Sequence, residues 1–190
     1  MSPKNSNETI WGSDVIASAL RETSIPYACL NPGASYRGLH DSLVNFLGNE
    51  NPKMLLNLHE EHAIAIAQGY AKVCNEPLIA IVHSNVGLMH ATMGIFNAWC
   101  DRVPMVVIGA TGPLDAAIRR PHIDWIHTAA DQGGLIRDYI KWDDQPGSPT
   151  TAVDAIRKGK QIACTPPYGP VYICLDSAVQ EMQLDEWPEF

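Results

Sequence analysis

The densest group of side chains that could do chemistry is the run His59-Glu60-Glu61-His62. Histidines beside carboxylates suggest zinc, but the zinc-protease motif places its two histidines four positions apart on one helix face. Here the spacing is three, and no third ligand follows at a matching interval. We therefore expect no metal site in this chain, and the two glutamates become the candidates for a functional role.

Helical geometry separates the two glutamates. Counting three, four and seven residues on from Glu60 gives an apolar stripe, made of Ala63, Ile64 and Ala67. The same count from Glu61 ends on the polar Gln68, so Glu61 is expected to lean toward solvent. Both acids suit the positive end of a helix dipole, which is a sufficient explanation for Glu61. It explains Glu60 poorly, because an unpaired carboxylate heading an apolar stripe is costly and such positions are often functional.

Two more polar segments stand where a strand hands over to a helix. One is Asn31-Pro32-Gly33, and the other is His83-Ser84-Asn85-Val86-Gly87. An alternative for the second is that Ser84 or Asn85 caps a helix and His83 has no special role. Ligands of doubly wound sheets sit outside the carboxyl ends of the strands, and Glu60 also follows a strand. Three such strand ends together favour a site.

The elements that must position these residues alternate between strand-like and helical segments. Strands are expected at 27–30, 54–58, 78–82, 103–109 and 170–175, with a short edge strand at 136–142. A first helix is expected to begin near Ser13, and a second is expected to end near Leu47. Further helices are expected at 60–73, 86–99 and 150–162. Residues 111–132 read as an irregular surface segment. This alternation predicts an α/β fold of three layers, with a mostly parallel sheet, helices on both faces and flavodoxin-like layering.

Composition excludes several classes of function. The 190 residues carry a net charge of −8 without a basic tract, which argues against nucleic acid or an anionic membrane as a partner. Apolar runs are too short to span a bilayer, and the start of the chain is not a signal segment. The five cysteines, an odd number without a CxxC pair, are expected to be reduced and buried. We accordingly expect a cytoplasmic protein.

The run from Glu60 to Lys72 resembles the pyrimidine-binding domain of thiamine-diphosphate enzymes such as acetolactate synthase, benzoylformate decarboxylase and pyruvate decarboxylase. That family has a glutamate, a helix of small residues and Gly-Tyr-Ala, with the glycine nine positions after the glutamate. Gly69 lies nine positions after Glu60. Further matches follow in order, and they comprise Asn31-Pro32-Gly33, His83 to Gly87, Asn97-Ala98-Trp99, 103–107 and Gly169 to Ile173.

The resemblance implies one pyrimidine-binding domain at 10–178, preceded by a disordered leader at 1–9 and followed by a truncated linker at 179–190. It implies that Glu60 hydrogen-bonds N1′ of thiamine diphosphate, and that Asn31, Pro32 and Gly33 approach the pyrimidine. His83 would face a 2-oxo acid substrate and assist proton transfer. Decarboxylation or carboligation would then follow in a homo-oligomer.

Two departures from the family pattern matter. Benzoylformate decarboxylase has serine directly after Asn-Pro-Gly, whereas this chain has Ala34 and then Ser35. The pyrophosphate-binding domain, through which Mg²⁺ would be held, is absent. Three interpretations therefore stay open: a fragment of a longer enzyme, a small subunit of a heteromeric 2-oxo acid decarboxylase, and a non-catalytic α/β binding or assembly module. A flavodoxin-like nucleotide domain is disfavoured because no phosphate loop is present.

Overall fold

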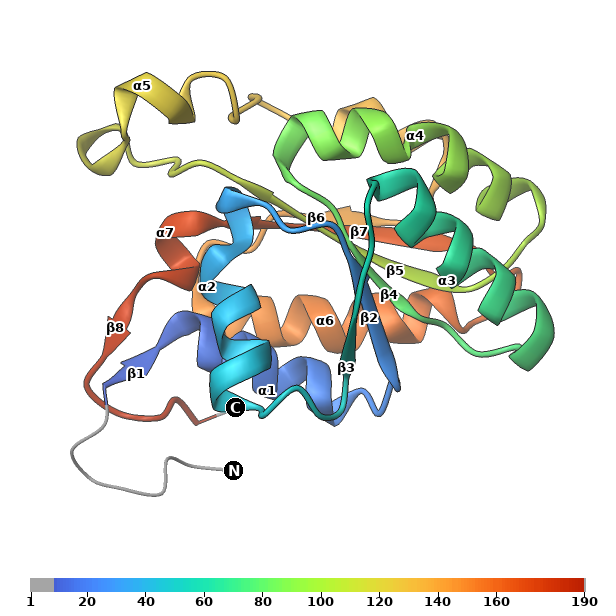
Figure 1. The fold of residues 1–190 in the computed structure, drawn as a ribbon, viewed down its shortest axis with the longest axis horizontal. Helices are drawn as coiled ribbons and strands as arrows, with labels where there is room; N and C mark the ends of the chain where they lie inside the picture. The colour runs from blue at the N-terminus through green and yellow to red at the C-terminus, as the bar shows by residue number, and fades with distance from the viewer. Residues whose placement is uncertain (1–8, 190) are drawn as a thin grey trace.

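The computed structural model describes residues 9–189 and shows one six-stranded, fully parallel sheet between two layers of helices (Figure 1). Its strands are β2 (Tyr27–Leu30), β3 (Lys53–Leu56), β4 (Ile79–Ile81), β5 (Met105–Thr111), β6 (Asp143–Asp144) and β7 (Pro170–Asp176). Their spatial order is β3-β2-β4-β5-β7-β6. The first four positions, β3-β2-β4-β5, follow flavodoxin order, because β3 comes after β2 in the chain but lies at the outer edge of the sheet. The expected α/β fold and its layering are confirmed.

Helices cover both faces of the sheet. They are α1 (Gly12–Glu22), α2 (Arg37–Asp41), α3 (Glu60–Cys74), α4 (Ser84–Cys100), α5 (Pro121–Asp124), α6 (Pro149–Ala163) and α7 (Ser177–Gln180). Short turns of other helix types lie at η1 (Ala34–Tyr36), η2 (Ser42–Phe46), η3 (Ala116–Ile118), η4 (Gly133–Leu135) and η5 (Arg137–Tyr139). In Figure 1, α3 and α4 lie on one side of the sheet and α1 and α6 on the other. Strands β4, β5 and β7 are buried throughout, as expected for a sheet covered on both faces.

The edge strand expected at 136–142 is wrong. Turns η4 and η5 occupy most of that stretch, and the edge strand is the two-residue β6 that follows it. The cause is local. Arg137 pairs with Asp131 at 2.8 Å and with Asp143 at 2.6 Å, which closes a compact turn ahead of the strand. So short an edge offers few unpaired backbone groups to another sheet.

Residues 179–189 pack on the domain and do not extend from it as a linker. Strand β8 (Gln183–Leu184) pairs antiparallel with β1 (Ile10–Trp11), and Trp187 stacks on Phe46 at 6.1 Å. The boundary expected at 178 falls inside α7. The leader expected at 1–9 lies, except for residue 9, outside the described residues.

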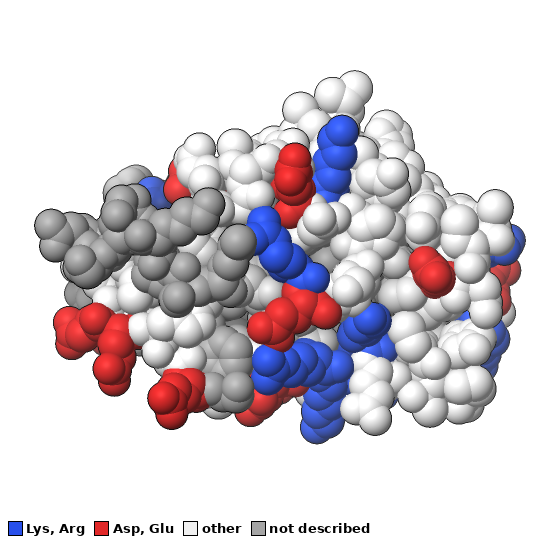
Figure 2. Space-filling model, turned by 90° about the horizontal axis from the view of Figure 1, so that it is seen from below, with Lys and Arg blue, Asp and Glu red and all other residues white. Residues whose placement is uncertain are grey.

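The face formed by α1 and α6 carries mixed charge. Figure 2, which looks onto the molecule from below, shows both acidic and basic side chains near the middle of this face, among the residues that the structure describes. An ion pair between Arg157 of α6 and Glu22 of α1, whose charged atoms are 2.6 Å apart, joins the two helices. Both side chains are roughly half exposed, so such a pair contributes at most about 1 kcal/mol.

Cysteine burial is only partly as expected. Cys29 and Cys174 are buried, whereas Cys74 and Cys100 are exposed and Cys164 is intermediate; all five are free thiols. Cys74 and Cys100 are the last residues of α3 and α4, where a helix end meets solvent. The expectation that apolar neighbours in the sequence indicate a buried cysteine was therefore wrong for these two residues. Among residues 9–189, no helix combines the length and apolar character needed to cross a bilayer.

Close packing of β5 against β7 predicts a stability defect. A methyl group on Gly109 would stand 2.1 Å from the hydroxyl oxygen of Tyr172, a fully buried ring on β7. We expect Gly109→Ala to lower the free energy of unfolding by about 1–3 kcal/mol, since the ring must move within a packed core. Urea denaturation measures the loss. Gly147→Ala is the control, because a methyl group there meets nothing within 4 Å. Equal midpoints for the two variants would contradict the prediction.

Candidate functional site

The sheet brings the predicted residues to one crevice. Asn31-Pro32-Gly33 follows β2, His83 follows β4, and Glu60 opens α3, which connects β3 to β4. Strand β2 lies between β3 and β4, so the chain reverses its direction across the sheet at the β2–β4 junction. Such a junction is where open α/β sheets leave room for a ligand.

Glu60 lies inside the protein although it is an acid. It is the first residue of α3 and is 5% exposed, while Glu61 beside it is exposed. Ala63, Ile64 and Ala67 on the same stripe are completely buried. The helical-face prediction is therefore confirmed for the burial of both glutamates. None of the six ion pairs within residues 9–189 involves Glu60. A buried carboxylate without a cation is costly unless a ligand satisfies it.

A glycine on α4 makes the space for that carboxylate. A methyl group on Gly87 would stand 2.6 Å from Oε1 of Glu60 and 3.1 Å from its Cδ. Two turns further along α4, a methyl group on Gly94 would meet Ile64 Cγ2 at 2.8 Å. Glycine inside a helix costs about 1 kcal/mol relative to alanine. Here the two glycines let α4 pack closely on α3, and the first leaves room for the carboxylate.

The loop after β2 contacts His83 directly. A methyl group on Gly33 would lie 2.5 Å from both Cβ and Cγ of His83, so only glycine allows this approach. Ser35 Oγ lies 2.8 Å from Nδ1 of His83 and accepts a hydrogen bond from the Ser84 backbone N–H at 3.1 Å. Residue 34, at the position where benzoylformate decarboxylase has serine, is an exposed alanine, so no hydroxyl stands there. The Ser35 hydroxyl, one position later, points to His83.

The turn into α4 holds a strained residue. Ser84 is completely buried and has φ of +38°, a conformation that residues other than glycine rarely adopt. His83 is the N-cap of α4 and makes no side-chain capping bond, and the Ser84 hydroxyl donates to Asn85 Oδ1 at 3.1 Å. The alternative in which Ser84 or Asn85 simply caps the helix is wrong. Strain of this kind costs about 1–3 kcal/mol and collects at functional sites.

Tyr36 ties the loop to the Glu60 side of the crevice. It is fully buried, and its hydroxyl donates a hydrogen bond to the backbone oxygen of Asn31. Burial, and then the negative charge of Glu60, raise the pKa of the Tyr36 phenol well above its usual range. Tyr36 therefore stays a neutral donor and fixes the backbone of the Asn31 turn.

His83 is biased toward its neutral form. Burial lowers its pKa below the usual 6.5, the neighbouring His127 lowers it further, and the charge of Glu60 partly opposes both. The two histidine rings lie 4.7 Å apart between centroids. His127 comes from the irregular segment after β5, whose Arg120 and Asp124 pair at 3.2 Å and line the same small cavity. At neutral pH the imidazole of His83 is thus uncharged.

Sequence reasoning missed four of these residues. Gly87, Tyr36, Ser35 and His127 all contact or influence the predicted residues, yet none was assigned a role. Two signals could have found some of them. A glycine inside a predicted helix marks a close approach, and the strand-end rule applies to the segment after β5 as well.

Comparison with known proteins places this arrangement in a family. The model of the "Thiamine pyrophosphate enzyme, N-terminal TPP binding domain" matches residues 10–135, more than half of the chain. The chain belongs to this family. Within the thiamine-pyrophosphate (TPP) enzymes, the acetolactate synthase large subunit of Lactococcus lactis is 28% identical over 176 residues, which are 92% of this chain and 29% of that protein. Benzoylformate decarboxylase of Pseudomonas aeruginosa is 25% identical over 126 residues, 66% of this chain and 23% of that protein.

Solved TPP enzymes share the fold. The crystal structure of benzoylformate decarboxylase from Polynucleobacter necessarius superimposes with a TM-score of 0.80 over 95% of this chain, at 22% identity. That alignment covers 32% of the decarboxylase chain. The TPP-binding domain described here therefore spans less than a third of the length of these relatives.

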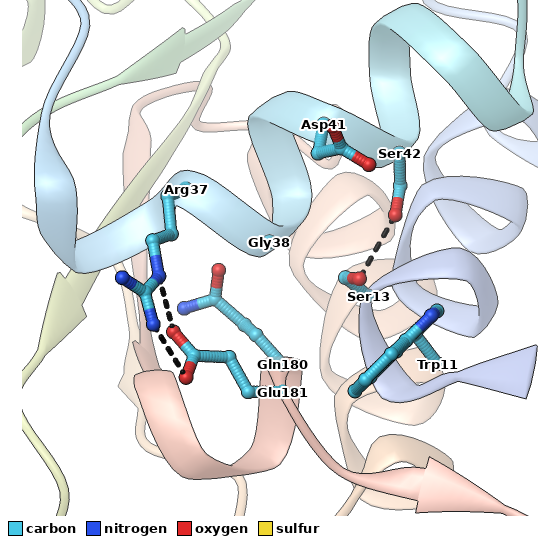
Figure 3. A pocket seen from close by; sticks show the side chains of 8 residues that line it. All are labelled: Trp11, Ser13, Arg37, Gly38, Asp41, Ser42, Gln180 and Glu181. Atoms are coloured by element: carbon cyan, nitrogen blue, oxygen red, sulfur yellow. Dashed lines mark hydrogen bonds and ion pairs between the residues drawn. The ribbon is translucent and has the colours of Figure 1, made fainter.

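A second hollow lies outside this crevice. An open hollow between α1, α2 and α7 is lined by Trp11, Ser13, Arg37, Gly38, Asp41, Ser42, Gln180 and Glu181 (Figure 3). The Arg37 guanidinium there binds both carboxylate oxygens of Glu181, at 2.8 and 3.0 Å. In the part of the chain that the structure describes, no three side chains of His, Cys, Asp or Glu come together in a way that could hold a metal.

Proposed function

We propose that this chain supplies the aminopyrimidine side of a thiamine diphosphate site in an enzyme that acts on 2-oxo acids, as a decarboxylase or an acetolactate-synthase-like carboligase. Family membership supports the cofactor, and the names of the relatives support the substrate class. The observation that carries the proposal is the buried, unpaired carboxylate of Glu60 against Gly87. No residue in the described range 9–189 donates a hydrogen bond to this acceptor, which lies at the point of the sheet where a ligand fits.

Glu60 would hold a hydrogen bond to N1′ of the aminopyrimidine. A hydrogen bond in an apolar site is electrostatically stronger than in water, and the Ala63–Ile64–Ala67 stripe supplies that setting. Gly87 leaves room for the carboxylate beside α4, so the Glu60 side chain would keep this position against the aminopyrimidine. The bound cofactor supplies the electron sink that decarboxylation of a 2-oxo acid requires.

The loop Asn31-Pro32-Gly33 would approach the pyrimidine through its backbone. Tyr36 holds the Asn31 carbonyl from behind, and the missing side chain of Gly33 leaves room for His83. His83 would face the substrate side of the site. It is neutral at working pH, which lets its imidazole exchange a proton or donate a hydrogen bond to the substrate.

A pyrophosphate-binding domain must complete the site, together with the Mg²⁺ that it would hold. The relatives are more than three times as long as the part that matches, which supports a missing domain. That domain would belong either to the same polypeptide or to a second chain, in an oligomer where the cofactor bridges two subunits. Throughout, "complete enzyme" means this chain together with that domain.

The 190-residue chain alone is expected to bind thiamine diphosphate weakly or undetectably and to show no turnover, because it forms only half of the site. Calorimetric titration with thiamine diphosphate and Mg²⁺, followed by a 2-oxo acid decarboxylation assay, measures both. The complete enzyme, expected to bind and turn over, is the positive control. Clear decarboxylation by the purified 190-residue chain would refute the half-site.

A further inference from the structure

Two hydrogen-bond donors of Ser35 converge on one nitrogen of His83. The Ser35 hydroxyl oxygen lies 2.8 Å from Nδ1, and the Ser35 backbone N–H donates to the same atom at 3.5 Å. The backbone N–H can only donate, so this long contact favours an Nδ1 that presents its lone pair to it. A proton on Nδ1 would face that N–H directly.

A second contact limits the directions open to the Ser35 hydroxyl. The backbone N–H of Ser84 donates to Ser35 Oγ at 3.1 Å, which occupies one of the oxygen lone pairs. The hydroxyl proton is left free to point at Nδ1. Both donors therefore favour the same protonation state of the ring, in which Nδ1 is bare and the single proton is on Nε2.

Gln180 holds Ser35 in this position. It is 1% exposed and reaches from α7 toward α2, as Figure 3 shows beside Arg37 and Gly38. Its Nε2 donates to the Ser35 carbonyl at 3.0 Å, and its Oε1 accepts from the Leu39 N–H at 3.3 Å. The two backbone partners fix the orientation of the amide, since one only accepts and the other only donates. The Gln180 amide thus joins α7 to the loop that positions His83.

We propose that Ser35 and Gln180 are positioning residues that hold His83 as the neutral imidazole protonated on Nε2. A ring in this form has one N–H donor, on Nε2, and no lone pair left free. This rests on the proposed function only for its consequence, which is that His83 donates a hydrogen bond to the carbonyl oxygen of the 2-oxo acid. Charge develops on that oxygen during attack, and a fixed donor stabilises it. Neutral imidazoles act as electrophiles of this kind in other enzymes.

Nitrogen NMR of the 190-residue chain tests the tautomer without any cofactor or activity. Bare and protonated imidazole nitrogens resonate far apart, and the variant His83→Gln identifies which of the seven histidines is His83. We expect separate His83 signals at neutral pH, one from a bare Nδ1 and one from a protonated Nε2. A ring protonated on Nδ1, or averaged signals showing both tautomers, would overturn the proposal.

Three variants then locate the cause. Ser35→Ala removes the shorter of the two donors and leaves only the 3.5 Å contact of the backbone N–H. We expect it to weaken the preference for one tautomer and to bring the two nitrogen signals closer together, while Ser35→Thr, which keeps a hydroxyl, should restore the preference. Gln180→Met keeps the volume but removes both hydrogen bonds, and a smaller change in the same direction is expected. Ser42→Ala is the matched control, because this buried serine bonds Ser13 and Asp14 away from His83.

The outcomes separate the proposal from the proposed function. If Ser35→Ala keeps the single tautomer, or changes it no more than Ser42→Ala does, Ser35 is not a positioning residue. The two proposals can fail independently. If His83 is protonated on Nε2 but the complete enzyme turns over no 2-oxo acid, the tautomer proposal is supported and the proposed function is refuted. Amide spectra of each variant show whether it is folded, and the measurement on the unaltered chain stands even if Ser35→Ala is not.

Discussion

Glu60→Gln in the complete enzyme is expected to lower turnover by about 10²–10⁴-fold, the range associated with a single group that exchanges protons in catalysis. Glutamine preserves the volume of a 5%-exposed side chain, so the fold and the packing against Gly87 should persist. What disappears is a carboxylate able to take and return a proton beside the aminopyrimidine. Steady-state kinetics with a 2-oxo acid measure the loss, and thermal unfolding checks the fold.

Glu61→Gln provides a matched control one residue away. It removes the same charge from the same helix turn, but its side chain is exposed. We expect turnover close to that of the unaltered enzyme. Equal rates for both glutamine variants would show that Glu60 takes no part in the chemistry, and would favour a non-catalytic binding or assembly module.

Gly87→Ala is expected to damage function far more than stability. The added methyl group would stand 2.6 Å from Glu60 Oε1, at the far end of a flexible side chain, so we expect the carboxylate to be displaced while the two helices keep their places. Displacing a reacting group by about 1 Å can cost about 10²-fold in rate, and we expect a loss of that order. The better helix propensity of alanine, about 1 kcal/mol, offsets part of the packing cost. Turnover and urea denaturation, measured together, test this separation.

Variants at two other glycines serve as controls for Gly87→Ala. Gly94→Ala, on the same helix, meets Ile64 Cγ2 at 2.8 Å, and should lower stability without a comparable loss in turnover of the folded enzyme. Gly69→Ala has open space and should be neutral or stabilising. If Gly87→Ala matched Gly94→Ala in both measurements, the space beside Glu60 would have only a structural role.

The layers of this fold could be predicted because hydrophobic periodicity, and the Gly and Pro residues that end elements, are local features of the sequence. Strands β2, β4, β5 and β7 and helices α3 and α4 begin and end within a few residues of expectation. The edge strand failed because Arg137 forms two ion pairs, one with each flanking aspartate, and their geometry depends on a turn that periodicity does not encode.

The candidate site was predictable where one helix face or one strand end carries the information. The burial of Glu60 follows from its own stripe, and Gly33 and His83 follow from strand ends that the sheet brings together. Ser35 and Gln180 are 145 residues apart, so the hydrogen bond between them is a product of tertiary packing. No spacing rule links such a pair.

The pairing of β1 with β8 bears on how this domain would be connected to further polypeptide in a longer protein. Ile10 faces Leu184 and Trp11 faces Gln183 across an antiparallel ribbon, where facing Cα atoms lie about 5 Å apart. The first and the last described strands therefore meet in one ribbon, and the chain beyond Leu184 continues along the domain to the contact of Trp187 with Phe46. Segments joined before Ile10 and after Leu184 would accordingly start from the same region of this domain.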